Sequence, residues 1–308
     1  MQTFVTQLEE KAGLPGLVEQ LHRRLSGSEL NTLLLELFRR RAADLGTPQV
    51  LQQFGANRFV KPSPIDQGEY LAYDATLVRR AKERGFRALQ LSPLAPLGTC
   101  SVLGPVAQNN VVTALRGVEA VADATNVLAL QVAQDTKKKS SREPIKYCTA
   151  HRHVRSQALT MPWHTAHFGI FCAVTGGFDT GGHSFELAAL QDHIDLYLAL
   201  LAEQFSFGDL ILRLYLKEDI TSLRHLLEKQ LSTLPAGMTL ELKDPGEGTS
   251  YYGQVQFKFF ARLGNGEINL IDGGFVDWTQ KLLQNRKHRL LISGAGTDLL
   301  LKLKLGLI

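Results

Sequence analysis

The sequence predicts an α+β protein in which helices flank a mostly antiparallel sheet and a helical extension precedes the core. Two observations support this class. Predicted strands meet mainly through hairpins, as where residues 254–262 are followed by the turn residues Gly264, Asn265 and Gly266 and then by a second strand. Helices are interspersed irregularly, whereas a doubly wound parallel sheet would alternate strand and helix along the chain.

Composition indicates a folded protein of the cytoplasm. The chain has 308 residues, of which 44% are hydrophobic and 21% are charged. No run approaches a membrane-spanning length, and the N-terminus lacks the basic and apolar pattern of a signal peptide. The three cysteines form no CxxC pair, and the net charge of +4 is too small to indicate nucleic-acid binding. We therefore expect no membrane partner and no disulfide framework.

Residues 1–55 predict a helical extension. Apolar residues recur there at helical spacing, and Ser26 and Glu29 have the spacing of a capping box. Pro15 and Gly27 interrupt the pattern, so we expect two short helices instead of one long helix. We assign residues 56–308 to the core, which begins with turn formers that predict a linker or lid.

The core contains several predicted helices and strands. Its first helix begins near Asp74 and is ended by Gly85, and Asp123 is placed to cap a later helix. Residues 185–203 are apolar almost all round and predict a buried helix. Further helices are expected from about Asp219, near Asp277 and over 297–305. The predicted strands cover residues 86–92, 145–155, 166–174, 209–215, 238–244, 254–262, 267–271 and 288–294.

The order of these segments resembles the class II aminoacyl-tRNA synthetases. Residues 83–98 (ERGFRALQLSPLAPLG) resemble motif 1, in which a helix leads into a strand that ends at proline. Residues 147–157 (YCTAHRHVRSQ) and 167–177 (HFGIFCAVTGG) resemble the two strands of motif 2. Residues 289–303 (RLLISGAGTDLLLKL) resemble motif 3, in which a strand passes through glycines into a buried helix.

Two further segments resemble the histidyl-tRNA synthetase branch, which includes the histidyl-tRNA-synthetase-like regulatory subunit of ATP phosphoribosyltransferase. Residues 247–253 (EGTSYYG) stand where that branch has its histidine-binding signature, and residues 273–277 (GGFVD) stand at its Gly-Gly-Arg-Tyr-Asp motif. The resemblance spans about residues 75–305 and ends after motif 3. It implies the class II catalytic-core fold without an anticodon-binding domain, so tRNA is not an expected partner.

The resemblance implies a nucleotide site in motif 2. Arg152 stands where the motif 2 arginine holds the α-phosphate of ATP, and Arg155, His164 and His167 are candidates for the outer phosphates. Arginine suits this role because its planar guanidinium binds phosphate oxygens in pairs. ATP and Mg²⁺ are the cofactors that the resemblance implies.

Three positions depart from the family pattern. Val154 replaces the acid of motif 2, Leu299 replaces the arginine of motif 3, and Glu247 replaces the arginine that opens the histidine signature. Losing two arginines from such a site removes favourable interactions with the charge that develops on ATP during activation. We therefore assign no catalytic residue and do not expect ordinary histidine adenylation.

The resemblance also implies a pocket for a small ligand. Tyrosines offer aromatic walls, Asp123 and Thr125 stand where the family contacts the amino group of its substrate, and Glu247 favours a ligand with a second positive group. The alternative is that the tyrosines belong to the sheet core and that the acids cap helices. The candidates are Asp123, Thr125, Glu247, Tyr251, Tyr252, Asp272, Gly273, Gly274, Gly294 and Gly296.

Histidines gather between residues 151 and 183, but we do not expect a metal site. His151 and His153 share one face of a strand because side chains alternate, and His164 and His167 lie on the returning side. No carboxylate or thiolate is fixed to these histidines by spacing, as it is in many zinc sites. The imidazoles serve equally well as hydrogen-bond partners.

Two functions fit these observations. One is a ligand-binding, regulatory protein that has lost activation chemistry. The other is an ATP-dependent ligase that activates an amino acid or a related carboxylate for an acceptor other than tRNA. A cationic side chain at the vacated motif 3 position, such as Lys302 or Arg289, would favour the ligase. We also expect a homodimer through motif 1, and residues 1–55 are a candidate surface for a protein partner.

Overall fold

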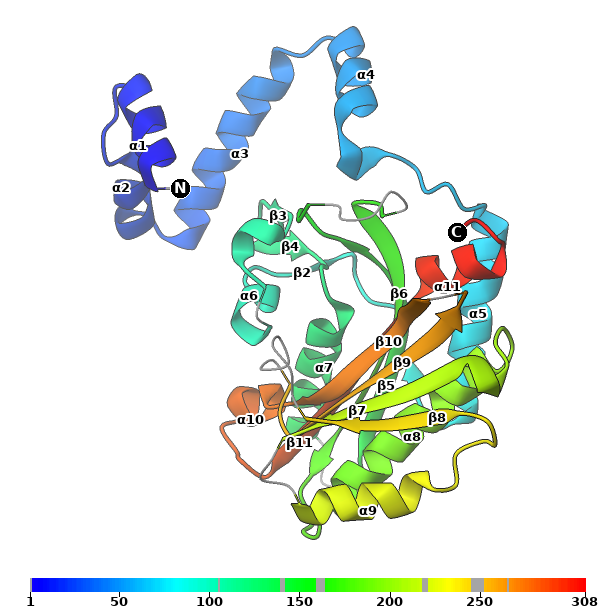
Figure 1. Ribbon diagram of the computed structural model, residues 1–308. Coiled ribbons are helices and arrows are strands. Elements are labelled where there is room, and N and C mark those ends of the chain that lie inside the picture. Colours follow the sequence, from blue (N-terminus) through cyan, green and yellow to red (C-terminus); the bar gives the residue numbers. More distant parts are fainter. Residues whose placement is uncertain are drawn as a thin grey trace.

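The computed structural model describes residues 2–104, 106–138, 142–158, 164–217, 221–244, 252–264 and 266–308. These residues form an eight-stranded sheet of order β1-β5-β6-β11-β10-β9-β7-β8 and a three-stranded sheet of order β2-β4-β3 (Figure 1). Neighbours in the large sheet are mostly antiparallel, while β1 pairs with β5 and β7 pairs with β8 in parallel. The predicted α+β fold with a mostly antiparallel sheet is confirmed.

The strands follow the predicted segments closely except at one edge. Instead of a strand over 86–92, the chain forms the short β1 and then β2, which joins the small sheet. Pro93 and Pro96 lack the N–H group that a continuing strand would need. The strands are β1 (Arg87–Ala88), β2 (Leu94–Pro96), β3 (Thr113–Ala114), β4 (Val118–Ala120), β5 (Ile145–Val154), β6 (His167–Phe178), β7 (Leu210–Leu216), β8 (Thr239–Lys243), β9 (Val255–Leu263), β10 (Gly266–Val276) and β11 (His288–Gly296).

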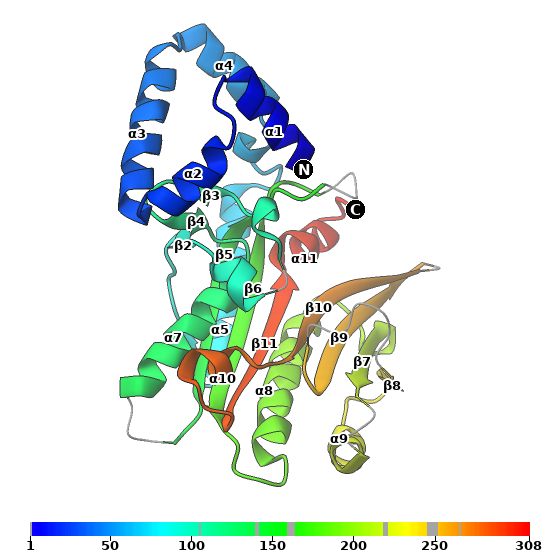
Figure 2. The ribbon, with the colours of Figure 1, turned by 90° about the vertical axis from the view of Figure 1, so that its left-hand side faces the viewer.

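Helices cover both faces of the large sheet. On one face α5, α8, α9 and α11 pack around Phe171, Phe257 and Phe259, and on the other face α7 and α10 pack around Val174. Figure 2 shows α8 and α9 on one side of the sheet and α7 and α10 on the other. Among the described residues, no helix has the length and apolar character needed to cross a membrane. The described helices of the core are α5 (Gln67–Glu83), α6 (Thr99–Leu103), α7 (Ala124–Lys138), α8 (Ser184–Leu201), α9 (Thr221–Leu231), α10 (Trp278–Leu283) and α11 (Thr297–Lys304).

The start of α5 differs from the prediction. The helix begins at Gln67 instead of near Asp74, because Asp66 caps it. The Asp66 carboxylate accepts hydrogen bonds from two backbone amides of the first turn, at 2.8 and 3.1 Å. Gly85 follows the helix in the left-handed conformation with a φ of 80°, as predicted.

The N-terminal extension consists of α1 (Gln2–Lys11), α2 (Leu17–Arg24), α3 (Gly27–Ala43) and α4 (Thr47–Ala56), where two short helices were predicted. Gly13 and Gly16 adopt φ values of 70° and 73° and separate α1 from α2. The predicted capping box of Ser26 and Glu29 begins α3. All residues of α2, α3 and α4 are described and none is buried. Figures 1 and 2 show the extension at the end of the core that carries the small sheet.

Candidate functional site

A cavity of about 460 Å³ opens at the end of the large sheet, where β11 continues into α11. Its walls come from segments that are far apart in the sequence, namely the two ends of the β5–β6 loop, β10 and the first turns of α11. Basic, acidic and aromatic side chains line it, including Arg155, His164, Phe168, Asp298 and Lys302. We call it the α11 cavity.

Asp298 is the buried acid of the α11 cavity, with 6% of its surface exposed. Its Oδ1 accepts hydrogen bonds from the Gly169 backbone amide at 2.7 Å and from the Tyr70 hydroxyl at 2.6 Å. Its Oδ2 has no hydrogen-bond partner among the described residues and lies 4.0 Å from the Arg152 guanidinium. Asp298 therefore joins α11 to β6 and α5.

Arg152 contacts the wall of the α11 cavity without lining it. Side chains alternate along β5, so Arg152 points to the opposite face of the strand from His151 and His153. Its guanidinium lies 5.2 Å from the centre of the Tyr70 ring, and its Nε donates to His167 Nδ1 at 2.7 Å. Of the four candidate nucleotide contacts, Arg152 and His167 thus lie outside the lining of the cavity.

Asp74 belongs to the same charged group as Asp298. Burial, and then the negative charge of Asp298, raises the pKa of Asp74 to about 6, while the positive charge of Arg152 acts in the opposite direction. One Asp74 oxygen is buried without a hydrogen-bond partner among the described residues. Asp74 of α5, Asp298 of α11 and Arg152 of β5 therefore form one group of interacting charges.

Arg155 and Phe168 line the α11 cavity together. The Arg155 guanidinium lies 5.3 Å from the centre of the Phe168 ring, and its Nε donates to the Ala122 carbonyl oxygen at 2.7 Å. The His153 ring stacks on Phe168 with a centroid distance of 6.1 Å. Burial lowers the pKa of His153 well below its ordinary value, so this imidazole is neutral. A cation beside an aromatic ring suits a ligand with a flat or an anionic group.

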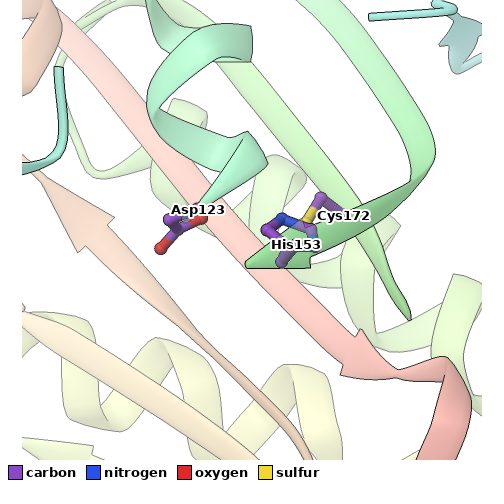
Figure 3. A group of neighbouring side chains, drawn as sticks. All are labelled: Asp123, His153 and Cys172. Carbon is purple, nitrogen blue, oxygen red and sulfur yellow. The ribbon is translucent and has the colours of Figure 1, made fainter. Parts of the chain in front are cut away.

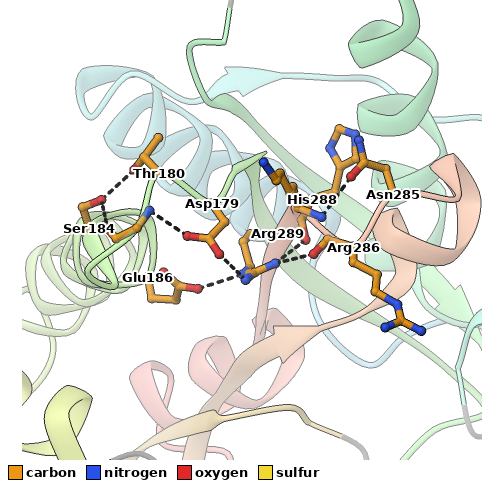
Figure 4. Close-up of polar contacts among 10 residues, drawn as sticks. Asp179, Thr180, Ser184, Glu186, Asn285, Arg286, His288 and Arg289 are labelled. Carbon is orange, nitrogen blue, oxygen red and sulfur yellow. Dashed lines mark hydrogen bonds and ion pairs between the residues drawn. The ribbon is translucent and has the colours of Figure 1, made fainter.

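The vacated motif 3 position faces the α11 cavity as Leu299, and Lys302 lines the same cavity one turn later. The other candidate cation, Arg289, lies at the opposite end of β11. There it donates to Asp179 at 2.6 Å and to Glu186 at 2.8 Å (Figure 4). Of the two cations that the sequence offered, Lys302 is therefore the one beside Leu299.

Asp123 and Thr125 lie at the start of α7. Asp123 Oδ1 accepts hydrogen bonds from the Thr125 amide at 2.9 Å and from the Thr125 hydroxyl at 2.7 Å. This is the helix-cap geometry that the sequence offered as the alternative to ligand binding. Within the described part of the chain, neither residue lines the α11 cavity.

The candidates on β10 pack closely against β9. A Cβ atom on Gly273 would lie 2.5 Å from a phenylalanine ring of β9, and one on Gly274 would lie 2.5 Å from the Tyr252 ring. Both positions therefore require glycine. Burial raises the pKa of the neighbouring Asp272. Across the sheet Asp272 pairs with Gly294 of β11.

The remaining candidates divide between the cavity and the undescribed part of the chain. Glu247 and Tyr251 lie outside the described residues. Gly296 lines the α11 cavity together with Arg155 and His164. The cavity thus unites candidates from motif 2 with one from motif 3.

Asp123, His153 and Cys172 come close enough to suggest a metal site, since their ligand atoms lie within 4.8 Å of one another (Figure 3). The hydrogen bonds argue against it. His153 Nε2 accepts the Ala124 backbone amide at 2.8 Å, and its Nδ1 pairs with the His151 carbonyl oxygen at 2.9 Å. Both ring nitrogens are therefore used. Burial also raises the pKa of the Cys172 thiol well above its ordinary value, which disfavours the thiolate that a metal would bind.

Sequence reasoning did not single out Asp298, Phe168 or Gly169 as site residues. The sequence does contain a local signal at Asp298, because an acid in the first turn of a helix interacts favourably with the helix dipole. That signal indicates the start of a helix and not a ligand site. Phe168 and Gly169 open the second strand of motif 2, but nothing in their spacing indicates a ligand. Their place in the site follows from the pairing of β6 with β11.

No protein-family model matches this chain, and no match is found among curated proteins. Solved structures match its fold. The histidyl-tRNA synthetase of S. aureus aligns with a TM-score of 0.60 at 12% identity, over 80% of this chain and 69% of that chain. An ATP phosphoribosyltransferase regulatory subunit/histidyl-tRNA synthetase from Bacillus halodurans aligns with a TM-score of 0.57 at 13% identity, over 79% and 83%.

A histidine–tRNA ligase subunit from Alicyclobacillus acidocaldarius also aligns, with a TM-score of 0.58 at 11% identity, over 80% of this chain and 96% of that chain. Identities this low establish the fold and leave the activity to be argued from the site. The chain has the fold of a class II aminoacyl-tRNA synthetase core, similar to histidyl-tRNA synthetases and to the related regulatory subunit.

Proposed function

We propose that this protein binds a small, amino-acid-like ligand in the α11 cavity and has a regulatory role instead of aminoacylating tRNA. The observation that carries the proposal is that both signs of charge line one cavity. Arg155 and Lys302 supply positive groups, and Asp298 supplies a carboxylate. A zwitterion, with an amine and a carboxylate, is complementary to such a wall.

The non-aminoacylating part of the proposal rests on Leu299. Amino-acid activation builds negative charge on the α-phosphate, and cationic side chains stabilise that charge. Leu299 faces the cavity with an apolar side chain where the family has an arginine. Similar folds include a regulatory subunit as well as synthetases, so loss of the chemistry is compatible with the fold.

The second candidate function is an ATP-dependent ligase, and Lys302 favours it. This residue lines the cavity beside Leu299 and is placed to replace the missing positive charge. The cavity also suits an adenine nucleotide. The Phe168 ring offers a flat surface for the base, and Arg155, His164 and Lys302 are candidates to hold the phosphates. Asp298 is the carboxylate in the described cavity lining that Mg²⁺ could use. ATP would supply the activating phosphate chemistry.

Thermal stability in the presence of ligands distinguishes the two functions. The purified protein is melted with each of the twenty amino acids, with ATP–Mg²⁺, and with both together. Ligand at a hundred times its dissociation constant adds about 2.7 kcal/mol to the free energy of unfolding. Stabilisation by an amino acid alone supports the regulatory protein. Stabilisation by ATP that an amino acid enlarges, together with pyrophosphate exchange, supports the ligase and overturns our first choice.

Arg155 is expected to matter more for ligand affinity than Arg152. Arg155→Ala removes a cation from the cavity lining, and we expect the affinity for an anionic or zwitterionic ligand to fall about tenfold. Arg152→Ala removes a cation outside that lining and should change the affinity by less than about threefold. Isothermal titration of both variants measures the difference. Equal losses, with unchanged melting temperatures, would contradict the placement of the ligand.

We also propose that the chain forms a homodimer through the motif 1 region, where Leu94 and Leu97 are exposed. Leu94→Glu should shift the dimer towards monomer at micromolar concentration, because a charge would enter an apolar interface. Sedimentation velocity measures the shift. Leu263→Glu, at a similarly exposed leucine at the end of β9, is the control and should leave the dimer intact. A monomeric wild-type protein would refute this proposal.

A further inference from the structure

The linker between the N-terminal extension and the core comprises residues 57–66. It forms hydrogen bonds with both ends of the β5–β6 loop. The Arg58 guanidinium donates to the Ser156 carbonyl oxygen at 2.5 Å and to the Gln157 carbonyl oxygen at 3.0 Å. At the other end of the loop, His167 Nε2 donates to the Lys61 carbonyl oxygen. Arg58 and Lys61, three positions apart in the linker, thus hold the two ends of the loop.

The two segments that the linker holds are also walls of the α11 cavity. Arg155, Gln157 and Ala158 line the cavity from one end of the loop, and His164 and Thr165 line it from the other. A carbonyl oxygen of Gln157 is itself a partner of Arg58. A movement of the linker would therefore move groups that face a bound ligand.

His167 connects the linker with Arg152 of β5 in the core. His167 Nδ1 accepts a hydrogen bond from Arg152 Nε at 2.7 Å, so its Nε2 carries the proton that Lys61 accepts. Arg152 in turn lies 4.0 Å from Asp298, the buried acid of the cavity. Polar contacts therefore connect the linker, through His167, with the charged group at the wall of the cavity.

On the outer side, the linker is attached to α4. The Lys61 ammonium lies 5.7 Å from the centre of the Phe54 ring, which belongs to α4. The extension itself packs loosely, because α2, α3 and α4 bury no residue. Farther along, Asn31 of α3 accepts a hydrogen bond from the Arg116 backbone amide at 2.7 Å. A rearrangement of the extension can thus reach the loop with little loss of packing in the core.

We propose that the N-terminal extension sets the conformation of the α11 cavity, with Arg58 and the Lys61 carbonyl as positioning groups that fix the two ends of its loop. The effect on ligand affinity rests on the proposed function, whereas the effect on the loop does not. Any event that shifts α4 would change the hydrogen bonds of Arg58 and Lys61. The cavity would then bind its ligand less tightly, so the extension regulates the site.

The first test needs no ligand. In the full-length Arg58→Ala variant, amide hydrogen exchange should become faster in residues 155–158 and 164–167, while exchange in the strands of the large sheet stays unchanged. Arg58→Lys retains one donor group and should restore part of the protection. Arg84→Ala is the matched control, because Arg84 also donates to backbone carbonyl oxygens but lies away from the cavity. Faster exchange throughout the core, or none in the two segments, overturns the proposal.

The second test measures affinity with two defined probes, L-histidine and ATP–Mg²⁺, by isothermal titration of the same variants. For whichever probe binds the wild type, Arg58→Ala should weaken binding about tenfold at an unchanged melting temperature, and Arg84→Ala should not. Local exchange that rises without any change in affinity overturns the regulatory role. If neither probe binds the wild type, the result counts against the proposed function, and the exchange data alone decide whether the linker positions the loop.

Discussion

Replacing Asp298 by alanine is expected to lower the free energy of unfolding by about 3 kcal/mol, the scale for breaking a buried, hydrogen-bonded charge. Asp298 is 6% exposed, and its carboxylate accepts hydrogen bonds from the Gly169 amide and the Tyr70 hydroxyl. Alanine leaves both donors without an acceptor and leaves Arg152 without its neighbouring charge. Urea unfolding should show a lower midpoint with an unchanged slope.

Two further variants separate the contributions at this position. Asp298→Asn keeps the shape and one acceptor oxygen, so we expect roughly half the loss of Asp298→Ala. Tyr70→Phe removes one donor and keeps the ring beside Arg152. Combining Tyr70→Phe with Asp298→Ala should cost less than the sum of the single losses, because the two groups share a hydrogen bond. Strict additivity would show that this bond does not contribute.

Acid is expected to destabilise the protein through His193. This residue is fully buried between α8 and the sheet, 2.9 Å from the Thr175 hydroxyl and 2.7 Å from the Ser293 hydroxyl, which also accepts from the Tyr197 hydroxyl. Burial, and then the positive charge of Lys146, lowers the pKa of His193 to about 3. The unfolded chain protonates its histidines near the ordinary value of about 6.5.

The sign of the effect follows from proton uptake. Between pH 6.5 and about 3 the unfolded state binds a proton at His193 that the folded state does not, so stability falls as the pH falls. The slope from one such group is at most about 1.4 kcal/mol per pH unit. His153 acts in the same direction, because burial also lowers its pKa. Asp74 acts in the opposite direction between its ordinary pKa and about 6, because its folded pKa is raised.

A variant that lacks only His193 isolates its contribution. His193→Gln should be less stable than the wild type at pH 7.5, because the smaller amide leaves space and cannot satisfy both hydroxyls; we expect a loss of about 2 kcal/mol. Below pH 6.5 the wild type loses stability faster than the variant, so the difference between them should shrink. Chemical unfolding of both proteins at several pH values measures this difference in the free energy of unfolding. A difference that stays constant from pH 7.5 to pH 4 would mean that His193 is not the titrating group.

The sequence predicted those elements whose signals are local. Ser26 with Glu29 begins α3, Gly85 ends α5 and Asp123 caps α7, since each of these signals involves residues within one turn of each other. The β5–β6 pair was predicted from its strand-forming residues. The small sheet was missed, because strands of two and three residues are too short to show alternation.

The candidate site was likewise predicted only in part. Motif order predicted that the β5–β6 loop and the start of α11 belong to one site, and the α11 cavity unites Arg155 with Gly296. Strand alternation could separate Arg152 from His153, but it could not tell which side α5 would cover. The choice between Lys302 and Arg289 as the cation beside Leu299 was equally open.

Only the tertiary structure decided these points, because each depends on contacts between residues far apart in the chain. Asp298 meets Tyr70 across more than two hundred positions, and Arg58 meets Gln157 across about one hundred. Such pairs leave no periodicity or spacing in the sequence, since they form when separate helices and strands pack on a common sheet. The sequence thus determined the class of fold and the segments of the site. Packing determined which side chains face the cavity and which hold it in place.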